Sequence, residues 1–221
     1  MKQSRNDKPF RCIGLCTANA AGNEVTGTAT GGFEEFVAAE GANIHFIDYH
    51  NGTLNQVIAG SDAKKSEDSE GHDGVITCIL HDGQLVFTGS TDEKIICWDL
   101  PTRKMVREMV GHEGAIVSLA AEATFLVSSG ADATLRLWNK SKGQQIRVIY
   151  GHSKSVLSME VGVDWLVTGS TDEEVRLWGI TKTKHSFAVD CSHRLIGHRC
   201  PVTVVRYGRL EIVSGAKIIY D

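Results

Sequence analysis

One eleven-residue stretch occurs three times in this chain at a constant interval. The copies "TGSTDEKIICW" (88–98), "SSGADATLRLW" (128–138) and "TGSTDEEVRLW" (168–178) begin 40 residues apart. A Gly-His pair precedes each copy, and its histidine stands 26 residues before the tryptophan in all three units. A period of 20 to 50 residues is typical of stacked structural units, none of which can bury its apolar faces alone. The repeat therefore limits the chain to a solenoid, a propeller or a related array.

Within each unit the residues alternate between short apolar runs and tight turns. The first clear unit reads "VITCIL", "HDGQ", "LVFTGS", "TDEK", "IICWDL", "PTRK" and "MVREMV". Runs of about five or six residues rich in Val and Ile, separated by Asp-Gly or Pro, predict an antiparallel meander of four strands. A sheet of this size with apolar residues on both faces must stack on its neighbours.

The spacing of the polar residues carries a family resemblance. Each clear unit has Gly-His, then a Ser/Thr-rich strand end, then a turn aspartate, and a tryptophan six residues later. This pattern resembles the WD40 repeat family of β-propellers. The three clear units cover residues 71–196, and both flanks are imperfect copies. Residues 35–48 align with the second and third strands but have Ile47 in place of the tryptophan, and 197–221 lack the turn aspartate and are four residues short between Gly215 and Tyr220.

The resemblance implies an all-β fold, a WD40-type β-propeller of about five recognisable blades. We expect an N-terminal tail over 1–9 and the propeller over 10–221, with units at about 10–60, 71–110, 111–150, 151–196 and 197–221 and a polar loop insertion at 60–71. Propellers close by completing one blade with strands from both chain ends. Because the last unit has no fourth strand and residues 1–10 are short and polar, we expect an incomplete propeller, an open arc. Missing residues of a truncated chain or a partner chain would then complete it.

The repeated polar residues are also of the types found in a hydrolase triad. A carboxylate would orient an imidazole that takes the proton of a hydroxyl. An enzyme needs such a site once, however, whereas this chain has three similar sets. In the family that the chain resembles, these residues and the tryptophan form a hydrogen-bonded tetrad inside each blade. The tetrads expected here are His72, Thr88, Asp92 and Trp98; His112, Ser128, Asp132 and Trp138; and His152, Thr168, Asp172 and Trp178.

Two other motifs contain residue types found in metal-binding or phosphate-binding sites. The segment "CSHRLIGHRC" (191–200) contains two cysteines and two histidines, but one-residue gaps do not match the usual spacing of zinc ligands. The glycine-rich "GNEVTGTATGGF" (22–33) lacks the Lys-Ser/Thr that completes a phosphate-binding loop. We therefore expect no catalytic residue, no metal ligand and no cofactor.

Charge and hydropathy limit the compartments and partners that we expect for the chain. No stretch of 18 apolar residues occurs, and no apolar run follows the basic N-terminal residues, so neither a membrane span nor a secretory signal is expected. The expected location is the cytoplasm or the nucleus, where the six cysteines would be small buried hydrophobes. The net charge of −4 gives no general attraction to nucleic acid.

Function on such a fold is expected in the loops at the two ends of the blades. We call the end with the Gly-His loops and the Asp turns the upper face, and the opposite end the lower face. Candidate binding residues on the upper face are Asp73, Thr91, Glu113, Ala131, Lys154, Thr171 and Arg199. Those on the lower face form a basic set: Arg103, Lys104, Lys140, Lys142, Lys182, Lys184 and Arg209. The side chains of the basic set either are simply solvated turn residues or dock an acidic partner such as a phosphoprotein, an RNA backbone or an anionic lipid.

The leading hypothesis is a non-catalytic scaffold that gathers protein partners through these faces, as the resemblance implies. One alternative is a substrate-recognition subunit of a ubiquitin ligase, because the compact units are similar to propellers attached to F-box or TRAF-type modules. No such module is present in these residues. The other alternative is a propeller enzyme with a Ser/Thr-His-Asp site.

Overall fold

The computed structural model describes residues 12–14, 35–48, 54–58, 71–183, 186–207 and 211–216. Within these ranges all regular structure is β-strand, which confirms the all-β prediction. Because the same ranges contain no helix, none in them is long and apolar enough to cross a membrane. The expected tail at 1–9, the glycine-rich segment at 22–33, most of the polar insertion at 60–71, Lys184, Arg209 and Tyr220 lie outside the described residues.

The strands fall into five antiparallel sheets that follow the repeat units. The first sheet has β1 (Cys12–Gly14), β2 (Glu35–Glu40), β3 (Asn43–Asp48) and β4 (Leu54–Ile58). The second has β5 (Ile76–Asp82), β6 (Leu85–Ser90), β7 (Lys94–Asp99) and β8 (Lys104–Val110). The third has β9 (Ile116–Ala121), β10 (Phe125–Gly130), β11 (Leu135–Asn139) and β12 (Gln145–Ile149). The fourth has β13 (Val156–Val161), β14 (Trp165–Ser170), β15 (Glu174–Lys182) and β16 (Phe187–Ile196). The fifth has β17 (Val202–Tyr207) and β18 (Ile212–Ala216).

Each four-stranded sheet is a simple meander with strands in chain order, as the sequence predicted. The sheets also share an irregularity. The pairing of the third and fourth strands shifts immediately before the tryptophan, at Cys97/Trp98, Leu137/Trp138 and Leu177/Trp178. The first sheet shifts at the matching position, between Phe46 and Ile47, although it has no tryptophan there. A bulge conserved in position among the sheets shows that the degenerate first unit has the same construction as the clear ones.

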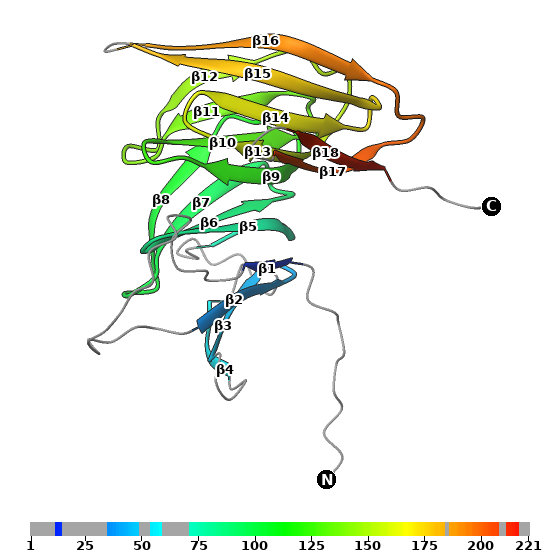
Figure 1. Ribbon diagram of the computed structural model, residues 1–221. Helices are drawn as coiled ribbons and strands as arrows, with labels where there is room; N and C mark the ends of the chain where they lie inside the picture. The colour runs from blue at the N-terminus through cyan, green and yellow to red at the C-terminus, as the bar shows by residue number, and fades with distance from the viewer. Residues whose placement is uncertain are drawn as a thin grey trace, which may run out of the picture.

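The sheets are blades arranged around a common axis. The first strands of successive blades contact one another, so that β1, β5, β9, β13 and β17 form the inner row. Figure 1 shows the blades following one another in chain order from the blue β1–β4 to the orange β16 and the red β18. Among the residues that the structure describes, the first and fifth sheets have no substantial contact. The described blades therefore form an open arc rather than a closed ring, as expected.

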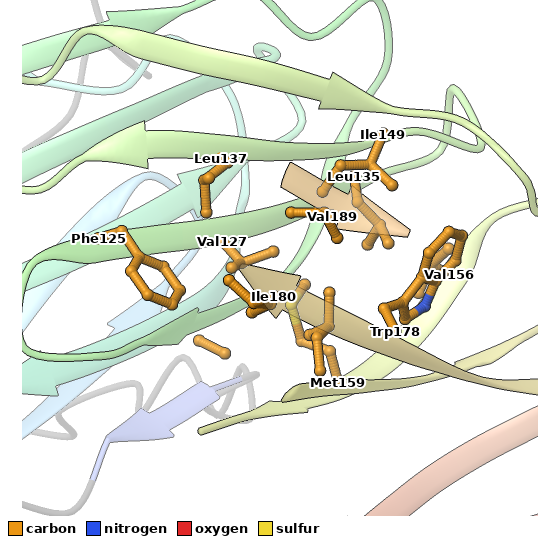
Figure 2. Packing of buried hydrophobic residues seen from close by; sticks show 12 residues of the cluster. Phe125, Val127, Leu135, Leu137, Ile149, Val156, Met159, Trp178, Ile180 and Val189 are labelled. Atoms are coloured by element: carbon orange, nitrogen blue, oxygen red, sulfur yellow. The ribbon is translucent and has the colours of Figure 1, made fainter. Parts of the chain in front are cut away.

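Hydrophobic cores fill the spaces between neighbouring blades. In the largest, Phe125, Val127 and Leu137 of the third blade pack against Val156 and Trp178 of the fourth; Figure 2 shows these side chains meeting between the two sheets. Each tryptophan of the repeat faces the preceding blade. Every blade in the interior of the arc thus stabilises both of its neighbours.

A glycine in the second strand sets how closely the next blade approaches. A Cβ at Gly89 would lie 2.4 Å from Ile116 Cγ2 of the third blade, and a Cβ at Gly169 would lie 2.6 Å from Val202 Cγ1 of the fifth. Only glycine at positions 89 and 169 leaves room for the β-branched side chain of the next blade. At Gly215, the matching position in the fifth blade, no described atom lies within 4 Å. The outward face of the fifth blade is therefore uncovered by the described residues.

Candidate functional site

The polar residues of the second blade form one continuous chain of hydrogen bonds. The Trp98 indole Nε1 donates to the Thr88 hydroxyl over 2.9 Å, and this hydroxyl lies 2.8 Å from His72 Nε2. His72 Nδ1 lies 2.8 Å from a carboxylate oxygen of Asp92. A neutral imidazole with its proton on Nδ1 satisfies every group, because Nε2 then accepts from the hydroxyl and Nδ1 donates to the carboxylate.

The third and fourth blades repeat this geometry closely. In the third blade, Ser128 Oγ lies 2.8 Å from Trp138 Nε1 and 2.7 Å from His112 Nε2, and His112 Nδ1 lies 2.8 Å from Asp132. In the fourth, the corresponding distances among Trp178, Thr168, His152 and Asp172 are 2.9, 2.7 and 2.8 Å. The structure thus brings all twelve residues together as three sets of four.

The turn aspartate also accepts hydrogen bonds from two stretches of backbone. Asp132 accepts hydrogen bonds from the Glu113 N–H over 3.1 Å and from the Thr134 N–H over 3.0 Å. Its counterparts Asp92 and Asp172 accept equivalent backbone bonds. Each aspartate therefore connects the Gly-His loop to the turn between the second and third strands, which explains why the two motifs recur together.

The electrostatics of the tetrads in the third and fourth blades favour a neutral histidine and a charged aspartate. Burial lowers the pKa of His112 and of His152 below 6.5, and this effect outweighs the hydrogen bond from each imidazole to its aspartate. Burial alone would raise the pKa of Asp132, but the Glu113 N–H, His112 and the Thr134 N–H hold it below its ordinary value. The carboxylate charge thus persists in a partly buried site because three donors surround it.

The hydroxyls of these sets are inaccessible to a substrate. Thr88, Ser128 and Thr168 are each 0% exposed, and the three histidines are buried as well. The indole N–H also occupies one side of each hydroxyl oxygen. A nucleophilic hydroxyl needs an open side on which a reacting carbonyl can approach. The arrangement can hold a blade together, and it offers no route to acyl transfer.

The fifth blade contains only half of this arrangement. His198 Nε2 lies 2.8 Å from Ser214 Oγ, which matches the imidazole–hydroxyl pair of the other blades. Across the described ranges, no carboxylate bonds to His198 and no indole bonds to Ser214. The sequence had indicated the missing turn aspartate, and the retained histidine–hydroxyl pair becomes evident only in the structure.

The repeated blade geometry has counterparts in known proteins. The family model described as "WD domain, G-beta repeat" matches residues 63–99, 103–139 and 143–179, which together are just over half of the chain. The chain belongs to the WD40 repeat family. WD40 propellers generally act as scaffolds for protein partners. No curated protein matches the chain in sequence.

Two solved structures show the same fold. One is the crystal structure of the computationally designed Ika8 protein, with 22% identity, a TM-score of 0.69, and coverage of 83% of this chain and 52% of that one. The other is a chain in the crystal structure of the mitotic checkpoint complex, with 16% identity, a TM-score of 0.69, and coverage of 83% and 54%. This WD40 chain therefore spans about half the length of each of these two structures.

The upper-face candidates lie as predicted at the ends of the blades. Six of them are exposed: Asp73, Thr91, Glu113, Ala131, Lys154 and Arg199. Thr171 is half-buried, and its hydroxyl donates to the Ser155 carbonyl over 3.2 Å. Three outer strands end on this side with exposed apolar residues that directly precede the Gly-His pairs at 111/112, 151/152 and 197/198: Val110, Tyr150 and Ile196.

The lower-face candidates differ in their exposure and in their contacts with neighbouring blades. Lys104, Lys142 and Lys182 are exposed. Lys140 instead bridges two blades, because its Nζ lies 2.5 Å from Asp82 of the second blade and 3.0 Å from the Glu122 carbonyl of its own. Arg103 lies over the Phe46 ring of the first blade at 4.9 Å from the ring centroid. Lys184 and Arg209 lie outside the described residues.

Other cross-blade contacts on the lower face were not foreseen. The Arg107 guanidinium donates to the Lys140 carbonyl, and Arg147 donates to the Phe187 carbonyl over 3.1 Å. Lys182 Nζ donates to Thr124 Oγ1 over 2.8 Å, which connects the fourth blade to the third. The sequence shows only a cluster of basic residues in turns, and it contains no signal that separates blade-bridging residues from exposed ones.

The cysteines and histidines of 191–200 do not converge. Cys191 is exposed with its Sγ 3.5 Å from the His193 carbonyl, while His198 bonds to Ser214. Over the described part of the chain, no three His, Cys, Asp or Glu side chains are grouped so as to hold a metal ion.

Proposed function

We propose that this protein is a non-catalytic scaffold that binds protein partners through the loops at the two ends of its blades. The observation that carries the proposal is the burial of the His and Ser/Thr side chains inside three blades alike, where each histidine is bonded to a partly buried Asp. The residues that differ between blades are the exposed ones at the strand ends. Differences among loops on a repeated frame are the usual basis of specific recognition.

The lower face supports recognition of an acidic protein surface. Lys104, Lys142 and Lys182 project from successive blades, and the nearby Asp82 is already paired with Lys140. Three exposed ammonium groups that carry no partner carboxylate favour association with a surface of opposite charge. The upper face, with Asp73, Glu113 and Lys154, has charges of both signs and supports a different set of partners.

Charge reversal tests this assignment. The intact chain and two variants would be used for affinity purification with quantitative mass spectrometry. The lower-face variant carries Lys104→Glu and Lys142→Glu, and Lys140 and Lys182 stay unchanged because each bridges two blades. The upper-face variant carries Asp73→Lys and Glu113→Lys. We expect acidic partners to be lost from the lower-face variant alone, with little change in melting temperature, since the substituted side chains are exposed.

Two results would contradict the scaffold function. Recovery of the same proteins at the same levels with all three forms would show that neither face binds. Labelling of Thr88, Ser128 or Thr168 by an active-serine probe would indicate an accessible nucleophile and an enzyme. The ubiquitin-ligase hypothesis requires a module that recruits the ligase, and no observation on the described residues favours it.

A further inference from the structure

Cationic side chains gather at the lower end of the junction between the second and third blades. The Arg107 guanidinium of β8 faces the third blade, because it donates to the Lys140 carbonyl. Met105 packs toward the first blade, against the cluster that contains Phe46. Because neighbouring side chains of a strand point to opposite faces, Lys104 lies on the third-blade face with Arg107. Lys104 is exposed, and Arg107 is half-buried.

The lower turn of the third blade brings Lys140 and Lys142 to the same place. Asn139 holds this turn, because its side-chain oxygen accepts from the Lys142 N–H and its carbonyl accepts from the Gly143 N–H, both over 2.8 Å. Gly143 has a φ of 70°, and a Cβ there would lie 2.9 Å from Arg107 Cδ. The turn therefore lies directly against the outer strand of the second blade, with the Lys142 side chain exposed.

The two carboxylates beside these cations are already engaged. Asp82 Oδ2 lies 2.5 Å from Lys140 Nζ, and the Lys140 side chain is only 15% exposed. Asp99 accepts the Thr102 N–H over 3.0 Å and the Thr102 hydroxyl as well. The four cations and these two carboxylates have a net charge of +2. The junction therefore has a surplus of positive charge that its own side chains do not neutralise.

The equivalent place at the junction of the third and fourth blades is closed. There β15 and β16 have 9 and 10 residues, against 6 and 7 in β7 and β8, and these longer strands reach the lower end of the third blade. Ile180 and Val189 are buried, and the Phe187 ring packs on Phe125 at a centroid distance of 5.6 Å. Within the described ranges, no such extension covers the junction of the second and third blades.

The limited extent of this basic area favours a compact anion over a long polyanion. At the same end of the molecule the fourth blade carries the exposed Asp164, and Lys182 is bonded to Thr124. The chain has a net charge of −4, which opposes extended contact with a nucleic acid or an anionic membrane. A phosphorylated serine or threonine carries about −1.5 to −2 charges near pH 7 on three clustered acceptor oxygens. Its charge matches the net charge of the junction in magnitude and is opposite in sign.

We propose that the lower end of the junction between the second and third blades binds a phosphorylated serine or threonine of a partner protein. Lys104 and Lys142 donate to the phosphate oxygens, the Arg107 guanidinium adds positive charge beside them, and Lys140 removes the repulsion of Asp82. This inference rests on the proposed scaffold function and deepens it, because it names the chemical group by which the lower face recognises a partner.

Fluorescence anisotropy with the intact chain tests the site. The probe is a fluorescein-labelled pool of short peptides with phosphoserine fixed at the centre and mixed residues elsewhere, and two matched pools carry serine or glutamate at the centre. We expect saturable binding of the phosphoserine pool and at least ten-fold weaker binding of the serine pool, because the fixed charge is lost. The glutamate pool should bind at least three-fold more weakly than the phosphoserine pool, since a carboxylate supplies less charge and only two oxygens.

Substitutions of single exposed lysines locate the binding. Lys104→Gln and Lys142→Gln should each weaken binding of the phosphoserine pool about five-fold, through the loss of one charge-assisted bond. Lys154→Gln makes the same change at an exposed lysine of the upper face and should leave binding unchanged. The melting temperatures of all three variants should stay close to that of the unaltered chain, because the substituted side chains are exposed.

Four results would overturn the inference. No saturable binding of the phosphoserine pool would exclude the site, and unchanged binding by both Lys104→Gln and Lys142→Gln would place it elsewhere on the chain. Equal binding of the phosphoserine and glutamate pools would mean that any acidic segment suffices. Tighter binding of a fluorescein-labelled oligouridylate, weakened by Lys142→Gln, would assign the junction to RNA. The charge-reversal purification registers acidic partners whether or not they carry a phosphate, so the scaffold function and the phosphate site fail separately.

Discussion

Each tetrad places a carboxylate, an imidazole and a hydroxyl in the order that a serine hydrolase uses, with distances of 2.7 to 2.8 Å. The difference lies in what surrounds the hydroxyl. In this chain an indole N–H and complete burial take the side on which a substrate would approach. The same residue types therefore give a structural network, because function depends on access as well as on hydrogen-bond order.

The aspartate carries the largest share of each network. Asp132→Ala removes the acceptor of His112 and of the backbone N–H groups of Glu113 and Thr134. We expect the free energy of unfolding to fall by about 2 kcal/mol, as for the loss of a charge-assisted bond that leaves buried donors unpaired. Urea denaturation would measure it. Glu113→Ala removes an exposed side chain and should change stability by less than about 0.5 kcal/mol, and equal losses in the two variants would refute the network.

The buried histidines should make stability depend on pH. Burial lowers the pKa of His112 and of His152 below 6.5 in the folded chain, so the unfolded chain binds protons at a pH where these folded imidazoles remain neutral. Their contribution is therefore complete above about pH 6.5 and is lost as the pH falls through the range below it. The slope contributed by each histidine in that range is positive and is at most about 1.4 kcal/mol per pH unit, the value for a difference of one bound proton. Denaturation curves at pH 7.5, 6.5 and 5.5 would show the decline, and constant stability over this range would contradict it.

The turns that follow the tetrad aspartates contain strained backbone. Glu93, Ala133 and Glu173 have φ values of 69°, 62° and 69°. These values lie in the left-handed region, which is unfavourable for residues other than glycine. Glu173→Gly should therefore raise the free energy of unfolding by roughly 0.5 to 1 kcal/mol, once the greater entropy of unfolded glycine is subtracted. Thermal denaturation would detect it. Gln84→Gly is an exposed turn position without positive φ and should lower stability, so the two variants should move in opposite directions.

At the scale of the blade, one position shows how much a neighbour contributes. Ile149 is buried between the third and fourth blades and is 5% exposed, whereas the corresponding Leu195 of the fourth blade is 42% exposed. Ile149→Ala should lower the free energy of unfolding by about 2 to 4 kcal/mol, through lost transfer energy and a residual cavity. Leu195→Ala should cost at least about 1 kcal/mol less than Ile149→Ala, because a smaller part of the Leu195 side chain leaves water on folding. Chemical denaturation of both variants would test this, and equal costs would mean that Leu195 is buried in solution.

The blades themselves were largely predictable, because strand, turn and tetrad signals recur in register three times. Even the degenerate first unit formed β2 and β3 where alignment with the clear units placed them. The bridges between blades were not predictable. Asp82 and Lys140 are 58 positions apart, and their pairing depends on the angle between two sheets, which a repeat pattern does not encode.

The candidate site was predictable only as residue types. Periodicity indicated which His, Ser/Thr, Asp and Trp belong together, since each set has the same spacing. The half-tetrad of His198 and Ser214 was hidden, because the fifth unit lacks the aspartate that marks the others. Its exposure also depends on which strands surround it, and this is a property of the whole arc.

At the scale of the whole molecule, the open arc should give the blades unequal stability. In a stacked array each unit gains free energy from the interface with each neighbour, so a unit with one interface is less stable than a unit with two. The third blade has hydrophobic clusters on both sides, whereas the described strands of the fifth have a cluster only against the fourth. Local opening should therefore be easiest at β17 and β18 and hardest in the third blade.

Hydrogen–deuterium exchange resolves this gradient. Amides of β10 and β11 should exchange most slowly, at a rate near that of global unfolding, because they lie in the middle of a sheet that is covered on both faces. Amides of β18 should exchange at least ten-fold faster than those of β14, which occupies the same place in its own fully paired blade. Uniform protection from β10 to β18 would mean that the fifth blade is covered in solution by something outside the described residues.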